Sequence, residues 1–319
     1  MENDSVERFL LARVANMYYE DGLTQQEIAD LLGISRLQVV RKLKKAREMG
    51  IVRIIIDSSY LGDVDTARQL REVFGLKDAV VVPSTATESG LRAALGKAAA
   101  NYVSIQVKPG SVVGIAWGRT LREMVLNLPR ISVKNLVVTN IIGGLSMMGD
   151  RGAQELALIM ARQLGGRANL LSVPFRVDTK NIKDALLADT AVAGTVRLAK
   201  GADIILVGVG SVTDEDLQEI YKSEGLYDLP TIEGMKALGA AGELIGRYYD
   251  TSGQVIPCER YENIVGLGLS DLKNGKTVLA VAGGERKVPA ILGALRGGFI
   301  NALVTDEGTA RELLRQQGG

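Results

Sequence analysis

The sequence predicts an α/β protein with a small N-terminal winged helix-turn-helix domain and a large α/β domain built on a mostly parallel sheet. Two short capped helices separated by a glycine lie within residues 24–48. From residue 58 onward, short apolar runs alternate with helical stretches. The chain has 319 residues, 46% of them hydrophobic, which is enough for two cores. We therefore expect domains at 1–57 and 58–319.

The composition excludes several classes of protein. No run of 18 apolar residues is present, so no membrane-spanning helix is expected, and the acidic N-terminus does not resemble a secretory signal. Cys258 is the single cysteine, which fits a reducing cytoplasm and excludes an intrachain disulfide. Histidine is absent, which removes histidine-based catalysis and zinc sites. We expect neither a metal site nor a cofactor.

The first domain begins with an amphipathic helix over residues 5–20. A capping box at residues 24–27 starts a second helix, and Gly33 supplies the left-handed turn that ends it. A second capping box, at residues 35–38, starts the third helix at once. Residues 50–56 follow as an expected β-wing. Together these signals predict a helix-turn-helix.

The third helix is expected to carry the DNA-binding surface. Ile34, Val39, Leu43 and Ala46 face inward, and residues 36–53 contain seven basic residues against the single acidic Glu48. Arginine and glutamine can hydrogen-bond to the edges of bases, and valine can contact the methyl group of thymine. Lysine can bind phosphates. A three-helix scaffold with a solvated surface is the alternative. The predicted DNA-binding residues are Thr24, Ser35, Arg36, Gln38, Val40, Arg41, Lys42, Lys44 and Lys45.

The second domain shows the alternation of a parallel sheet that is covered on both faces. Ligands of such sheets bind beyond the carboxyl ends of the strands, so the turns after the strands are the places to search. Expected strands are 79–82, 112–117, 136–142, 170–173, 203–208, 277–282 and 302–305. Expected helices are 88–107, 120–128, 153–164, 181–198, 286–296 and 308–316.

The first candidate ligand site is the segment GIAWGRT at residues 114–120. A strand ends at Trp117, Gly118 allows close backbone approach, and Thr120 is expected to cap the next helix. Backbone N–H groups and the Arg119 guanidinium would then hold a phosphate or another anion. A simple tight turn between strand and helix is the alternative.

Two further turns have similar features. Gly283 and Gly284 follow an expected strand and precede Lys287, although Lys287 could also be an ordinary surface lysine. Asn140 follows another strand, and the pair Gly143 and Gly144 comes shortly after it. For two acidic residues, the sequence leaves open whether the side chain binds a ligand or stabilises local structure. Asp250 could accept sugar hydroxyls or form an Asp-x-x-Gly turn, and Asp306 could bind a ligand or cap the last helix.

The order of these segments resembles the SorC family of bacterial sugar-responsive transcriptional regulators. The resemblance begins in DGLTQQEIADLLGISRLQVVRKLKKAREMGIV and covers about residues 5–315. It continues through GIAWGRT, NLLSVPFRVDT, DALLADTAV, DIILVGVGSV, GAAGELIGRYYDTSGQVI, IVGLGLSDL and VAGGERKVPAILGALRGGFINALVTDEGTA.

The resemblance implies a large domain similar in fold to ribose-5-phosphate isomerase and glucosamine-6-phosphate deaminase that serves as a sensor. It also implies an effector, usually a phosphorylated sugar or polyol, and a tetramer on an extended operator. By matched position, Gly118, Arg119 and Thr120 look like phosphate-loop residues. Lys287 looks like the basic residue that contacts the phosphate or a ligand oxygen, and Asp250 looks like the acceptor of hydrogen bonds from ligand hydroxyls. Asn140 and Gln154 match less closely. A lysine that forms a Schiff base in some members is replaced here by residues 140–142, so no imine is expected.

The leading hypothesis is therefore a regulator of a carbohydrate operon that binds operator double-stranded DNA and a small-molecule effector. A free sugar or polyol stays open as the effector, because the phosphate inference depends on Arg119, Lys287 and the glycine turns. The alternative function is a sugar-phosphate isomerase or deaminase with an added DNA-binding domain. Its base would be Asp250, Glu285 or Glu307, and no sequence feature marks any of them as buried and poised.

Overall fold

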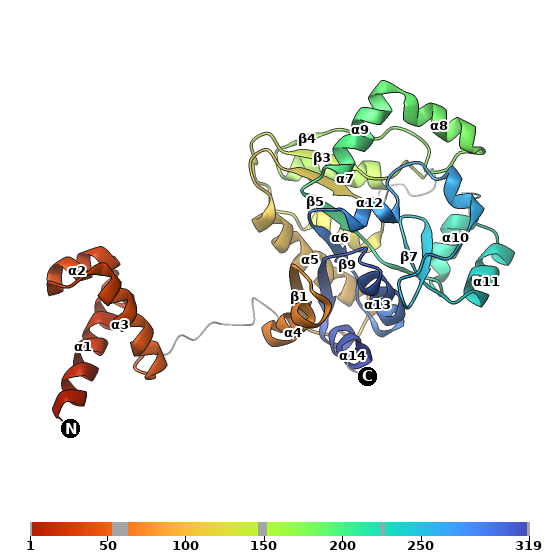
Figure 1. Ribbon diagram of the computed structural model, residues 1–319. Coiled ribbons are helices and arrows are strands. Elements are labelled where there is room, and N and C mark those ends of the chain that lie inside the picture. The colour runs from red at the N-terminus through yellow and green to blue at the C-terminus, as the bar shows by residue number, and fades with distance from the viewer. Residues whose placement is uncertain (1, 53–62, 146–151, 224, 226, 318–319) are drawn as a thin grey trace. The chain divides into compact units, whose positions relative to one another are not determined.

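A computed structural model describes residues 2–52, 63–145, 152–223, 225 and 227–317 (Figure 1). The chain divides into two compact units, Met1–Asp57 and Ser58–Gly319. Each unit has its own hydrophobic core.

The described part of the first unit, residues 2–52, contains the helices α1 (Glu2–Tyr19), α2 (Gln25–Leu32) and α3 (Arg36–Glu48). Both predicted capping boxes are confirmed, at Thr24 and at Ser35, and Gly33 ends α2 in the left-handed conformation with φ of 64°. The three helices enclose a core that includes Val14, Ile28 and Val39. Of the predicted wing, residues 53–56 lie outside the described residues, and residues 50–52 form a turn and bends.

The second unit is built on a seven-stranded sheet in the order β1-β10-β9-β5-β2-β3-β4, in which every pairing is parallel. This confirms the predicted α/β class. The chain moves outward in one direction from β2 through β3 to β4, and in the other direction from β5 through β9 to β10. The strands are β1 (Asp78–Val82), β2 (Val112–Ile115), β3 (Val137–Asn140), β4 (Arg167–Ala168), β5 (Ile204–Val207), β9 (Val278–Val281) and β10 (Ala302–Asp306).

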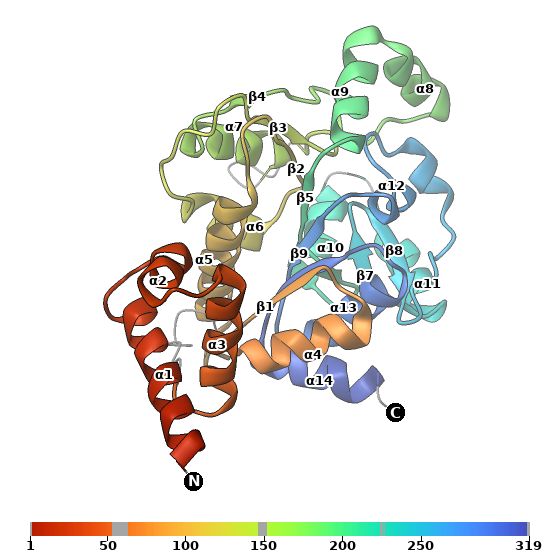
Figure 2. The ribbon, with the colours of Figure 1, turned by 60° about the vertical axis from the view of Figure 1, so that its left-hand side comes forward.

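Helices cover both faces of this sheet. In Figures 1 and 2, α5, α6 and α7 lie on one face, whereas α4, α13 and α14 lie on the other. The helices are α4 (Val64–Phe74), α5 (Glu88–Gln106), α6 (Arg119–Leu126), α7 (Ala153–Gln163), α8 (Lys180–Ala188), α9 (Thr190–Lys200), α10 (Glu215–Ser223), α11 (Leu229–Ala237), α12 (Leu269–Lys273), α13 (Val288–Arg296) and α14 (Glu307–Gln317). Among the described residues, short 3-10 helices are formed by η3 (Glu259–Asn263) and η4 (Glu285–Lys287).

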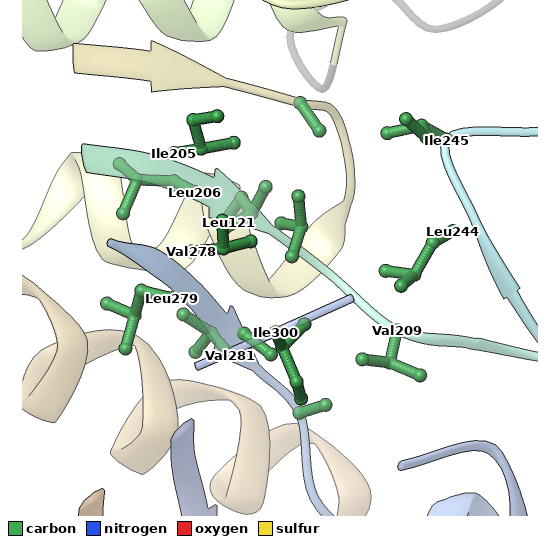
Figure 3. Packing of buried hydrophobic residues seen from close by; sticks show 14 of the residues in the cluster. Leu121, Ile205, Leu206, Val209, Leu244, Ile245, Val278, Leu279, Val281 and Ile300 are labelled. Carbon is green, nitrogen blue, oxygen red and sulfur yellow. The ribbon is translucent and has the colours of Figure 1, made fainter. Parts of the chain in front are cut away.

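A second, three-stranded antiparallel sheet joins β6 (Gly210–Ser211), β7 (Ala240–Leu244) and β8 (Arg247–Asp250). Ile245 and Gly246 both have positive φ and form the tight turn of the β7–β8 hairpin. Figure 3 shows the side chains of Leu244 and Ile245 pointing from this hairpin toward the large sheet, where Val209 follows β5. This sheet was not predicted from the sequence. Its hairpin forms a further wall at the carboxyl ends of the large-sheet strands.

The structure corrects several predicted elements, among them the strand expected at 136–142, which ends at Asn140. Residues 170–173 form no strand, and the edge strand is the two-residue β4. The helix expected at 181–198 is two helices, because Asp189 accepts hydrogen bonds from the amides of Ala191 and Val192 and so starts α9. The helix expected from residue 286 begins with the 3-10 turn η4. The strand expected at 112–117 ends at Ile115.

Four of the described helices, α4, α10, α11 and α12, were not predicted. The likeness of the large unit to sugar-phosphate isomerases and deaminases stays a prediction. Among the described residues, none of the helices is long and apolar enough to cross a membrane.

Candidate functional site

The exposed face of α3 is the candidate nucleic-acid surface. The backbone N–H of Gln38 donates to the Ser35 hydroxyl, and the backbone N–H of Ser35 donates to Gln38 Oε1. This reciprocal pair fixes the start of the helix. Val39 and Leu43 are buried, so the opposite side of α3 faces solvent. The predicted DNA-binding residues Thr24, Ser35, Arg36, Gln38, Val40, Arg41, Lys44 and Lys45 are all exposed, and Lys42 is partly buried.

Several of these side chains already have partners within the unit. Arg36 Nε donates to Gln25 Oε1 of α2 at 3.4 Å, and Lys45 Nζ lies 2.5 Å from Glu7 Oε1 of α1. The Thr24 hydroxyl donates to its capping partner Glu27 at 2.7 Å. Exposed pairs of this kind contribute little free energy, so a DNA phosphate can compete for the cations.

Leu37 lies on the same surface and was not among the predicted DNA-binding residues. Its side chain is 58% exposed, and that of Val40, one turn later, is 39% exposed. An apolar pair on the outward side of α3 has the chemistry that thymine methyl groups contact. The signal was present in the sequence, because Leu37 stands between the outward-facing Arg36 and Gln38.

The candidate effector site is a cavity in the second unit, beyond the carboxyl ends of β2, β5 and β9. The cavity lies where the strand order changes direction, between β2 and β5, which is the usual ligand position in such sheets. The β7–β8 hairpin closes it from one side. Lining residues used below are Glu88, Arg92, Trp117, Gly118, Arg119, Thr120, Val209, Asp214, Glu243, Ile245, Gly283 and Lys287.

The turn after β2 carries the predicted phosphate loop. Gly118 has φ of 136°, a conformation that side chains disfavour, and it occupies the N-cap of α6. The helix therefore starts one residue earlier than expected, and Thr120 lies in its first turn rather than at the cap. Gly118 has no side chain that could cap the first amides of α6, and a helix start of this kind suits an anion. Gly118, Arg119 and Thr120 all line the cavity.

Lys287 reaches the same cavity from the turn after β9. Its Nζ donates to the backbone carbonyl of Val209 at 2.8 Å, so the ammonium group lies between the ends of β5 and β9. Burial lowers the pKa of Lys287, and the nearby Arg119 lowers it further, whereas the charge of Asp214 opposes both effects. A bound anion would favour the charged form of this lysine.

The glycine pair after β9 is held in place by Asp306. The Gly284 amide donates to Asp306 Oδ1 at 2.8 Å, and a Cβ on Gly283 would lie 2.4 Å from the same oxygen. Asp306 also accepts from the amide and hydroxyl of Thr309, and so caps α14. Gly283 lines the cavity. Gly284 lines an adjoining pocket that shares Arg119 and Lys287 with the cavity, and we call this pocket the mouth of the cavity. Asp306 therefore shapes the loop rather than facing a ligand.

Glu243 is a cavity residue that the sequence analysis missed. It comes from the hairpin strand β7 and is 3% exposed. Burial raises the pKa of its carboxyl to about 7, although the Gly246 amide, which donates to Oε1, and the positive charges of Arg247 and Lys287 act in the opposite direction. A buried carboxyl at the cavity wall can accept hydrogen bonds from ligand hydroxyls and, when it is protonated, can also donate one to them.

The structure keeps four predicted effector residues away from the cavity. The Asn140 amide nitrogen donates to the carbonyls of Ile142 and Leu171, and its oxygen accepts from the Leu171 amide. Gln154 Nε2 donates to the same Leu171 carbonyl. A Cβ at Gly143 would meet the backbone of Pro174, and one at Gly144 would meet Gln154. These contacts organise the turn after β3, and the four residues do not line the cavity.

Asp250 is also absent from the cavity lining. Its Oδ1 accepts hydrogen bonds from the Ser252 amide, the Ser252 hydroxyl and the Gln254 amide at 2.7–2.9 Å. These bonds close the turn after β8, which is the alternative that the Asp-x-x-Gly pattern left open. Of the bases considered for an enzyme, Glu285 lines the mouth and is exposed, whereas Asp250 and Glu307 do not line the cavity.

No group of three or more metal-binding side chains occurs among the residues that the structure describes. The arrangement can thus bind a small polar ligand with an anionic end near Arg119 and Lys287 and hydroxyls near Glu243.

Comparison with known proteins places the chain in a family. Residues 58–315 match the family model described as "Putative sugar-binding domain". The chain is 33% identical over 322 residues to the sorbitol operon regulator of Klebsiella pneumoniae, covering 99% of this chain and all of that protein. It is 34% identical over 317 residues to the transcriptional regulator LsrR of Escherichia coli K12, covering 98% and 97% respectively.

The crystal structure of the full-length sorbitol operon regulator SorC from Klebsiella pneumoniae superimposes with a TM-score of 0.74 at 31% identity, over 96% of this chain and 98% of that one. The sugar-binding domain of a transcriptional repressor from Vibrio fischeri gives the same TM-score at 23% identity, which supports the fold alone. These relatives are named as regulators and not as enzymes. The chain belongs to the SorC family of transcriptional regulators, in which a sugar-binding domain accompanies the DNA-binding unit.

Proposed function

We propose that the chain controls a carbohydrate operon by binding operator double-stranded DNA through α3 and a phosphorylated sugar or polyol in the cavity. One observation carries the effector assignment. Arg119 and the uncapped start of α6 share a cavity with Lys287 and with the buried Glu243. The cations and amides suit a phosphate, and the carboxyl suits hydroxyl groups.

Regulation requires that the effector bind two states of the protein with different affinities. We propose a homotetramer, a dimer of dimers, in which effector binding changes how pairs of α3 helices match the half-site spacing. Family resemblance supports this assembly. The DNA partner and the lone Cys258, which is unpaired, support a cytoplasmic location.

A thermal-shift screen of sugar phosphates, free sugars and polyols tests the effector class. A ligand that binds only the folded protein at 100 times its Kd adds about 2.7 kcal/mol of stability. A shift with phosphorylated compounds alone supports the proposal. A shift with free sugars or polyols alone contradicts the phosphate assignment, although a sugar-responsive regulator would remain.

Selection from a random-sequence DNA pool, followed by titrations with and without the hit compound, tests the regulator assignment. An enriched motif whose affinity changes with the compound supports the proposal. Binding that ignores both sequence and compound contradicts it. Light scattering in solution tests the tetramer.

A further inference from the structure

Asp214 stands at the start of α10, on the wall of the cavity. Its Oδ1 accepts a hydrogen bond from the Leu217 amide at 3.2 Å, which caps the helix, and its own amide donates to the Ser211 carbonyl at 3.0 Å. The other carboxylate oxygen, Oδ2, lies 3.6 Å from a guanidinium nitrogen of Arg119. One side chain therefore links the first turn of α10 to the loop that we assign to the effector anion.

The same carboxylate acts on the second cation of the cavity. Among the charges near Lys287, that of Asp214 has the largest effect and favours the ammonium form. Asp214 and Arg119 are both partly buried, with side chains 19% and 32% exposed, so water screens their interaction less than that of a surface pair. The two cationic groups that would receive a phosphate already have an internal anion beside them.

We propose that the Asp214 carboxylate is an internal counter-ion that occupies part of the effector's anion position, and that an incoming phosphate group displaces it from Arg119. This inference depends on the proposed function, because it concerns the same cavity. Two anions beside one guanidinium repel each other, so phosphate binding and the Asp214–Arg119 pair are mutually unfavourable. Asp214 thereby weakens the binding of every anion that cannot replace it.

The displacement has a path to the rest of the fold. Tyr221 lies on α10, and its ring meets that of Trp117 edge to face with centroids 5.9 Å apart. Trp117 is the sole tryptophan of the sequence and lines the cavity next to the phosphate loop. Release of Asp214 from Arg119 frees the start of α10 to move against Trp117. Tryptophan fluorescence therefore reports the step directly.

The test uses the full chain with inorganic phosphate as the probe, titrated by calorimetry and by Trp117 fluorescence at low ionic strength. Asp214→Asn removes the charge and keeps a good capping residue. We expect it to tighten phosphate binding by about fivefold, the factor that corresponds to a partly exposed ion pair. Glu215→Gln removes a neighbouring charge that is exposed at the mouth, and we expect a change of less than about twofold.

Asp214→Ala removes both the charge and the cap, so it separates the two roles. It should tighten phosphate binding as Asp214→Asn does while lowering the melting temperature. If Asp214→Asn binds phosphate no more tightly than the unchanged protein, the inference is wrong and the proposed effector site stands. If neither protein binds phosphate, the anion site itself is wrong and the inference fails with it.

Discussion

The Nζ of Lys287 lies 2.8 Å from the backbone carbonyl of Val209, so a cation that follows β9 is fixed to the end of β5. Lys287→Ala should weaken a phosphorylated effector by about 10- to 100-fold, the range for a charged hydrogen bond, and its unphosphorylated analogue much less. Lys276→Ala is the control, because Lys276 pairs with Asp203 outside the cavity. Calorimetric titration of the two ligands checks this. Equal losses for both ligands would contradict the phosphate assignment.

Glu243 should make stability depend on pH. The pKa of its carboxyl is raised to about 7 in the folded protein from an ordinary value of 4.5, so the folded state binds more protons than the unfolded state between these values. Stability from this group is full below pH 4.5 and is lost as the pH rises through 7, by about 3 kcal/mol. Urea unfolding from pH 4.5 to 8 measures it.

Glu243→Gln is the matched variant for this measurement, because glutamine resembles the protonated acid and does not titrate. The stability of the native protein relative to the variant should therefore fall between pH 4.5 and 7. Two parallel curves would contradict a protonated Glu243 in the folded state.

Arg41→Ala should abolish operator preference, because an exposed arginine on α3 that contacts a base discriminates by about 1–3 kcal/mol. Effector affinity should be unchanged, since the effector cavity is formed by the second unit. Lys44→Ala should instead weaken binding to all sequences about equally and reduce its salt dependence. Fluorescence anisotropy with specific and scrambled DNA distinguishes the two. Loss of both DNA and effector binding by Arg41→Ala would indicate unfolding.

Asn140→Ala should destabilise the second unit by about 1–3 kcal/mol, since it leaves the buried backbone N–H of Leu171 without its acceptor. Asn127→Ala is the control. Its side chain makes one exposed bond to the Glu123 carbonyl and should matter by less than about 1 kcal/mol. Urea denaturation compares the two. If Asn140→Ala instead lost effector affinity with full stability, Asn140 would be a ligand residue after all.

Local chemistry explains what the sequence could predict. The capping boxes at Thr24 and Ser35 depend on residues three apart, and the strands β2 and β9 depend on short apolar runs, although β2 ends two residues before the predicted end at Trp117. These signals also placed Arg119 and Lys287 at the carboxyl edge of one sheet. Asp189 carried a capping signal too, within LADTAV, but the helical periodicity on both sides concealed it.

Long-range packing explains what the sequence could not predict. Glu243 stands in the apolar stretch AAGELIG, and only the hairpin fold shows that its carboxyl is buried against the cavity. Asn140 ends β3 as a ligand residue would, yet its side-chain amide is hydrogen-bonded to the Ile142 carbonyl and to the backbone of Leu171. The Asp250 carboxylate accepts hydrogen bonds from the backbone N–H groups of Ser252 and Gln254. The matched position of Asp250 in the family therefore did not predict that it lies outside the cavity lining.

The cavity has walls from two different sheets, since Arg119 and Lys287 follow strands of the large sheet and Glu243 belongs to the small one. A bound effector would therefore tie the two sheets together and oppose the motions that separate them. Amide hydrogen exchange should then slow in the β7–β8 hairpin and at the ends of β2 and β9. The backbone of β1, at the far edge of the large sheet, should exchange at an unchanged rate.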